Sequence, residues 1–134
     1  MNELPDNNHD EARRLLANVE DDLRSVRHMV GDAEVVGRIG CFLAHLTVEK
    51  ALKAALVDAG VPFKKTHNLL HLYGLCTEAG RLRGLDTAEL AALNPWAIDG
   101  RYTDDLRDAT RAEALRFAAL AEAIVAALRS EMDR

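Results

Sequence analysis

The sequence predicts an all-α fold, an antiparallel up-and-down bundle of four to five helices that forms one domain over residues 1–134. Three observations favour this fold. The chain has 134 residues, enough for one hydrophobic core and too few for two. Hydrophobic residues make up 49% of it and aromatic residues only 4%, a balance typical of helices packed through Ala and Leu. Apolar residues also recur at helical spacing in long stretches separated by short connections.

The first predicted helix begins near residues 7–10, where Asn and Asp side chains can cap it, and ends at Gly31 and Asp32. Its apolar residues alternate at spacings of four and three, which places them in one stripe: Ala12, Leu16, Val19, Leu23, Val26 and Val30. Charged residues occupy the other faces. We therefore expect one buried face and an otherwise solvated surface.

A central helix is predicted over residues 38–60, and we expect the rest of the chain to pack around it. Apolar side chains cover most of its circumference, and Gly60 followed by Pro62 is a typical helix end. Glu49 and Lys53 interrupt this apolar surface, in a sector that also holds Phe42, Leu46 and Leu56. A pair at i and i+4 can satisfy itself, with the lysine ammonium reaching water.

Three further helices complete the predicted bundle. The third follows a cap at Thr66 or Asn68 and stops at Gly80. The fourth is shorter, starts from a capping box at residues 86–89 and is interrupted by Asn and Pro at residues 94–95, before Trp96. The last helix is long and begins directly after residues 101–102, with Asp104 and Asp105 in its first turn. Its predicted packing residues are Leu106, Phe117, Leu120, Ile124 and Leu128.

Charge and the N-terminal sequence exclude several classes of protein. The formal net charge of -5 argues against a general electrostatic grip on nucleic acid, although a local basic patch is compatible with it. The first residues contain neither a basic start nor an apolar run, and no stretch approaches the roughly twenty apolar residues that span a bilayer. We therefore expect a cytoplasmic protein that is neither secreted nor inserted in a membrane.

Histidine and cysteine residues offer two sites, and each has a simpler interpretation. His67 and His71 lie four residues apart and could give two ligands to a metal, but no acidic residue completes a metalloprotease pattern. Cys41 and His45 have the same spacing and could form an activated thiolate, yet a cysteine on an apolar helix is more often part of the core. Cys76 has no closely spaced partner for zinc. We expect no metal, no cofactor and reduced thiols.

Two groups of residues suit a phosphate. Glu49, Lys50 and Lys53 place two cations beside one carboxylate, and the net positive charge on an otherwise apolar helix could hold a phosphate or a nucleotide. The alternative is a self-satisfied salt bridge. Arg101 and Tyr102 combine a guanidinium and an aromatic ring just before a predicted helix N-terminus, which suits a phosphate that carries a base. The alternative there is a structural loop arginine paired with Asp99, Asp104 or Asp105.

Three motifs of the chain resemble those of the HEPN family, the higher eukaryotes and prokaryotes nucleotide-binding domain. They are Val-Glu-Lys-Ala-Leu-Lys-Ala at residues 48–54, Lys-Thr-His-Asn-Leu at residues 65–69 and Arg-Tyr-Thr at residues 101–103, in the family's order. The resemblance covers nearly the whole chain. Two departures are His45 and Leu46 where the family often has Gln, and Thr103 where it has Pro.

The resemblance implies a small helical bundle that commonly forms a homodimer and is often paired with a minimal nucleotidyltransferase in toxin–antitoxin or defence systems. Many family members are metal-independent ribonucleases with an Arg, four to six residues, then His motif. Arg101 matches the Arg, but Leu106, Arg107 and Asp108 occupy the positions for the His, so the motif is broken. Arg38 and His45 match the spacing by count, on a different helix.

These observations leave three hypotheses. The first is a non-catalytic module that binds a nucleotide or a nucleotidyltransferase partner through a cleft lined by Glu49, Lys50, Lys53, Arg101 and Tyr102. The second is a ribonuclease toxin whose catalytic groups come from Arg38, His45, His67 and Arg101, since general acid–base cleavage of RNA needs such groups. The third is a purely structural helical dimer, in which the charged residues hold the helices in register.

Overall fold

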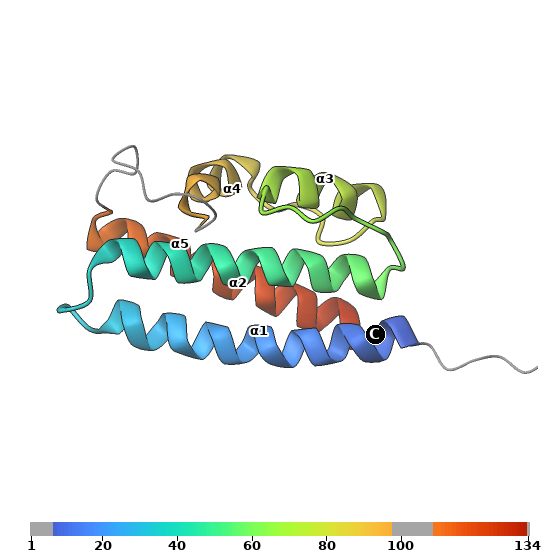
Figure 1. Cartoon of the computed structure of the whole chain (residues 1–134), viewed down its shortest axis with the longest axis horizontal. Coiled ribbons are helices and arrows are strands. Elements are labelled where there is room, and N and C mark those ends of the chain that lie inside the picture. The colour runs from blue at the N-terminus through green and yellow to red at the C-terminus, as the bar shows by residue number, and fades with distance from the viewer. Residues whose placement is uncertain (1–6, 98–108, 134) are drawn as a thin grey trace, which may run out of the picture.

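The computed structural model describes residues 7–97 and 109–133 (Figure 1). In chain order its elements are α1 (Asn7–Gly31), α2 (Gly37–Asp58), α3 (Leu69–Glu78), α4 (Thr87–Leu93), the short 3-10 helix η1 (Asn94–Trp96) and α5 (Arg111–Met132). All regular structure in these two ranges is helical, which confirms the predicted all-α bundle. None of the helices that the structure describes is both long enough and apolar enough to cross a membrane.

The α2 helix lies at the centre of the bundle, as the sequence predicts. It packs against α1 and α5 on one side, while α3 and η1 contact it on the other (Figure 1). Many of its buried residues are small, among them Ala44, Ala51, Ala54 and Ala55. Small side chains let neighbouring helices approach closely, and this explains how a chain with few aromatic residues fills its core.

The first helix also matches its predicted pattern. Ala12, Leu16, Val19, Leu23 and Val26 are buried, and Val30 packs at the edge of the core. The α2 helix ends at Asp58, two residues before the predicted end at Gly60, and Gly60 closes it as predicted. Gly60 has a φ of 70°, and the amide of Val61 donates to the carbonyl of Leu56 at 2.9 Å, a left-handed helix end that glycine favours.

Asn68 and Asp86 cap the two short helices, as the sequence predicts, but the predicted capping box at residues 86–89 is wrong, because the Glu89 carboxylate accepts from Nε of Arg116 instead. The side chain of Asn68 accepts hydrogen bonds from the amides of Leu70 and His71 at the start of α3. Asp86 accepts from Ala88 and Glu89 at the start of α4. The predicted break at Asn94 and Pro95 is the short 3-10 helix η1.

The predicted start of the last helix was wrong. Ala109 and Thr110 are not helical, and α5 begins at Arg111. The reason is a capping box, in which the Thr110 hydroxyl accepts from the Glu113 amide while the Glu113 carboxylate accepts from the Thr110 amide. Of the predicted packing residues, Phe117, Ile124 and Leu128 are buried and Leu120 packs at the edge of the core. Asp104, Asp105 and Leu106 lie outside the described residues.

Candidate functional site

A buried carboxylate lies at the centre of the candidate site. Glu49 is 5% exposed, in the part of α2 that the apolar pattern assigns to packing. Its Oε2 accepts a hydrogen bond from Nζ of Lys53 at 2.9 Å, and its Oε1 lies 2.9 Å from Nδ1 of His67. A buried carboxylate is costly without partners, and here each oxygen has one. The predicted Glu49–Lys53 pair is therefore confirmed, and His67 completes it.

Local structure holds these partners in place. Lys53 is one helical turn after Glu49 on α2, so the helix itself sets the spacing of the pair. His67 belongs to the connection between α2 and α3. There the amide of Asn68 donates to the Thr66 hydroxyl, and the Asn68 side chain caps α3. The connection is thus anchored at the residue next to His67.

His45 lies one turn before Glu49 and is 2% exposed. Its Nδ1 is 3.7 Å from Oε1 of Glu49, and its Nε2 is buried without a hydrogen-bond partner. Burial lowers the pKa of His45 to about 4, although the charge of Glu49 acts in the opposite direction. The imidazole is therefore neutral at pH 7. We call His45, Glu49, Lys53 and His67 the Glu49 cluster.

In the Glu49 cluster the donor side chains of Lys53 and His67 are partly exposed to solvent, while the Glu49 carboxylate is buried. The side chains of Lys53 and His67 are 22% and 38% exposed, against 7% for Glu49. Just before His67, Lys64 and Lys65 are exposed, and neither has an ion-pair partner in the described part of the chain. The sequence interpretation missed these two lysines. The signal that could have found them is the run Phe-Lys-Lys at residues 63–65, an aromatic residue beside two cations in a short connection.

The structure separates several residues that the sequence grouped together. Lys50 turns to α1, where its Nζ binds Asp22 at 2.9 Å, so it does not join Lys53. Arg38 lies at the start of α2, and the 11 residues from it to Glu49 correspond to roughly 16 Å along the helix axis. His71 is exposed in the first turn of α3. Within the described ranges, no three His, Cys, Asp or Glu side chains are arranged to hold a metal ion.

Arg101 and Tyr102 are the second predicted phosphate-binding group. Both residues lie outside the described ranges. Because α5 begins at Arg111, Arg101 stands ten residues before the helix rather than next to it. Their predicted use of the amides at a helix N-terminus stays a prediction. Cys41 is fully buried, which places the predicted Cys41–His45 pair inside the core, as the simpler interpretation holds.

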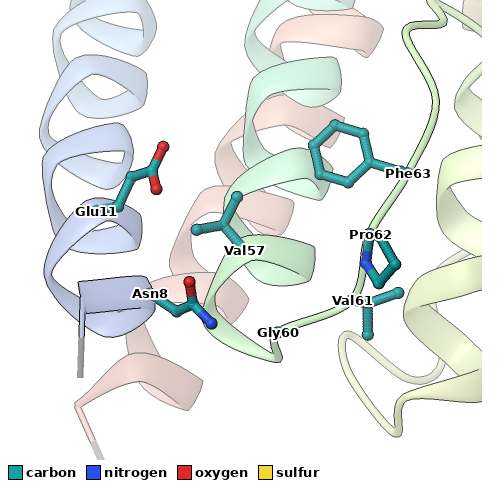
Figure 2. Close-up of a pocket in the computed structure, with 7 residues that line it drawn as sticks. All are labelled: Asn8, Glu11, Val57, Gly60, Val61, Pro62 and Phe63. Carbon is teal, nitrogen blue, oxygen red and sulfur yellow. The ribbon is translucent and has the colours of Figure 1, made fainter. Parts of the chain in front are cut away.

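A groove lies at the C-terminal end of α2, where Val57 follows Lys53 of the Glu49 cluster by one helical turn. Figure 2 shows the residues that line it. It has a volume of about 370 Å³ and lies between the first turns of α1, the last turn of α2 and the connection that follows; its main lining residues are Asn8, Glu11, Val57, Val61, Pro62 and Phe63. A smaller cavity of about 260 Å³ adjoins Arg38, Val36, Gly37 and Ala109. The sequence interpretation did not identify either of them.

A second buried carboxylate closes the same end of the bundle. Oδ1 of Asp58 lies 2.6 Å from Nδ1 of His9, and its Oδ2 accepts from Nη1 of Arg81 at 2.6 Å. Nε of Arg13 in turn donates to Nε2 of His9 at 3.0 Å. Burial raises the pKa of Asp58, but the hydrogen bonds from Arg81 and His9 lower it more, so the pKa lies below its ordinary value. We call His9, Arg13, Asp58 and Arg81 the Asp58 cluster.

Comparison with known proteins agrees with this fold. The family model described as the HEPN domain matches residues 12–131. The crystal structure of an archaeal HEPN homologue superposes with a TM-score of 0.68 at 20% sequence identity, covering 90% of this chain and 97% of the archaeal one. At that identity the likeness shows the fold alone. No curated protein sequence matches this chain.

Proposed function

The chain belongs to the HEPN family, and from that premise we propose that it is a non-catalytic module that binds the phosphates of a nucleotide or of RNA at the Glu49 cluster. One observation carries the proposal. The side chains of Lys53 and His67 are held at the surface by a single buried carboxylate, beside two exposed lysines that have no ion-pair partner among the described residues. Such an arrangement suits an anion.

The connection between α2 and α3 carries the excess positive charge of the site. Glu49 balances the charge of Lys53, so the pair alone is neutral. Lys64 and Lys65 add two positive charges that no carboxylate in the described structure offsets. A phosphate attracts ammonium groups and accepts charge-assisted hydrogen bonds from them. The basic patch is therefore local, on a chain whose net charge is -5.

The positions of the candidate acids and bases support a module without catalysis. The positions that should supply a histidine after Arg101 hold Leu106, Arg107 and Asp108. His45 is inside the core, and Arg38 is roughly 16 Å along α2 from Glu49. Of the candidates that the structure describes, His45 and Arg38 do not meet at a point that a phosphodiester could reach.

A ribonuclease is the second candidate, because one observation favours it. The carboxylate of Glu49 lies at hydrogen-bond distance from Nδ1 of His67, and a carboxylate that orients a histidine is a common device of general-base catalysis. In that case the chain would cleave RNA without a metal. Cleavage of a short RNA that is lost in His67→Gln would favour this candidate.

Calorimetric titration with ATP, GTP and a short RNA, at low and moderate salt, tests the proposal directly. We expect saturable binding that weakens with salt and falls about tenfold or more in Lys53→Gln, because a cation–phosphate contact is lost. Lys50→Gln is the matched control, since Lys50 lies on the same helix but binds Asp22. A cleavage gel on the same RNA should show intact strands. Equal losses in the two lysine variants would contradict the proposed site.

The family resemblance supplies further parts of the proposal. We expect Arg101→Ala, and less strongly Tyr102→Ala, to weaken the same binding. We also expect a homodimer in the cytoplasm, with a minimal nucleotidyltransferase as a possible partner in a toxin–antitoxin or defence pair. Light scattering on the purified protein measures its oligomeric state, and co-expression with a nucleotidyltransferase encoded next to it measures the pairing.

A further inference from the structure

We propose that the groove at the end of α2 is a base subsite for a guanine nucleotide whose phosphates lie at Lys53. This inference rests on the proposed function and adds the identity of the base. The groove has a volume of about 370 Å³, within the range of roughly 300 to 1,000 Å³ that is usual for small-molecule sites.

The walls of the groove suit the flat faces of a base. Val57 comes from α2, and Val61 and Phe63 come from the connection that follows it. Figure 2 shows the Phe63 ring turned back toward Val57. The ring is partly exposed, so one face of a base can stack on it without displacing a core residue.

The polar groups of the groove come from α1. Asn8 and Glu11 are three residues apart on one face of the helix, and both line the groove (Figure 2). Neither the Asn8 amide nor the Glu11 carboxylate has a hydrogen-bond or ion-pair partner in the described ranges. Their hydrogen-bonding capacity is thus available to a ligand.

These two groups match the edge of guanine better than that of the other bases. Guanine presents N1–H and N2–H₂ side by side, and a carboxylate can accept from both with its two oxygens. Its O6 accepts next to N1, where the amide nitrogen of Asn8 can donate. Adenine presents an unprotonated N1 to the carboxylate instead, which is an acceptor against an acceptor. The groove therefore discriminates between the two purines by hydrogen bonding.

Position along α2 connects the base subsite to the phosphate site. Val57 follows Lys53 by four residues and Lys53 follows Glu49 by four, so each step is about 6 Å along the same side of the helix. The connection runs alongside in the opposite sense, from Phe63 in the groove to His67 at Glu49, with Lys64 and Lys65 between them. A base beside Phe63 thus directs its ribose and phosphates toward Lys53 and the two loop lysines.

Calorimetric titration of the full chain with GTP, ITP, ATP and inorganic triphosphate tests this inference. We expect GTP to bind about tenfold or more tightly than ATP, and ITP, which lacks the N2 amino group, to lie between them. Glu11→Gln should remove the preference for GTP, because GTP loses the carboxylate that accepts from N1–H and N2–H₂ while ATP loses an unfavourable acceptor opposite its N1, and triphosphate binding should stay unchanged. Glu78→Gln, an exposed carboxylate on α3, is the matched control. Phe63→Ala should weaken all three nucleotides and leave triphosphate binding intact.

The possible failures separate the inference from the proposed function. Equal affinity for GTP and ATP, or a preference that Glu11→Gln leaves unchanged, overturns the base subsite and leaves phosphate binding standing. If triphosphate binds as tightly as GTP, the base adds no affinity, and the base subsite is likewise overturned. No binding of any nucleotide, of triphosphate or of RNA overturns both proposals. Thermal melting of each variant confirms that Glu11→Gln and Phe63→Ala are folded when they are titrated.

Discussion

Two buried carboxylates on α2 bind the same kinds of partner, but these partners connect different parts of the molecule. Glu49 binds one histidine, His67, and one cation, Lys53. Asp58 binds one histidine, His9, and one cation, Arg81. Their side chains are similarly buried, at 7% and 8% exposure.

The difference lies in what the partners connect. The cation of Glu49 comes from the same helix, four residues away, so the bond joins parts that the helix already holds together. The partners of Asp58 come from α1 and from the segment after α3, which are 49 and 23 residues away in sequence. The Asp58 cluster is therefore a clamp between distant segments. The Glu49 cluster joins α2 only to the connection that directly follows it, through His67 18 residues away, and we expect it to contribute less to stability.

The largest expected effect is the loss of the clamp. Asp58→Ala leaves Arg81 and His9 without their shared acceptor and opens a void between three segments, and we expect it to lower the free energy of unfolding by roughly 3 kcal/mol. Urea unfolding followed by circular dichroism measures this change. Glu49→Gln keeps the side-chain volume, and its amide can still accept one hydrogen bond and donate another. We expect it to lower the free energy of unfolding by roughly half as much. A larger loss in Glu49→Gln would reverse the comparison.

The two clusters lose stability as the pH falls, but over different pH ranges. The pKa of His45 is lowered from 6.5 to about 4, so the unfolded chain takes up a proton more readily than the folded one. Its contribution to stability is complete above pH 6.5 and is lost as the pH falls toward 4. Between pH 7.5 and pH 5 we expect a loss of about 2 kcal/mol.

Urea unfolding at several pH values checks this loss. In His45→Leu the dependence over that range should flatten, whatever the variant's stability at neutral pH, while the exposed histidine variant His28→Gln should retain it. Asp58 contributes in a lower range, because its lowered pKa supports stability above its ordinary value of 3.8 and loses it below. If the stability of His45→Leu fell with pH as steeply as that of the unchanged protein, a group other than His45 would be responsible for the loss.

The comparison also shows which parts of the fold the sequence could predict. The stripe of α1, the Gly60 end of α2 and the caps at Asn68 and Asp86 follow from local rules, and the structure has all of them. The start of α5 was missed because Asp104 and Asp105 look like a first helical turn, while the capping box that sets the start is Thr110 with Glu113. The sequence offers two plausible helix starts close together, and the prediction chose the acidic pair instead of the capping box.

Prediction of the candidate site succeeded within one helix and failed between elements. The pair of Glu49 and Lys53 needed only the helical repeat. The turn of Lys50 toward Asp22, the approach of His67 to Glu49 and the clamp at Asp58 depend on how distant segments pack, which residue spacing does not reveal. The groove beside Phe63 was missed for the same reason, since its polar groups, Asn8 and Glu11, come from α1, which is distant from Phe63 in the sequence.

The smallest predicted effect compares the two cations directly. Lys53→Met leaves one oxygen of Glu49 without its donor, and Arg81→Met does the same to Asp58, but only Arg81 joins segments that are distant in sequence. We expect Lys53→Met to cost about 1 kcal/mol of unfolding free energy and Arg81→Met about 2 kcal/mol. Urea unfolding of the two variants side by side resolves this difference. Equal costs would mean that the lysine also serves to hold the bundle together. A small cost at Lys53 would show that its charge is not required for folding, as expected for a residue retained to meet an anion.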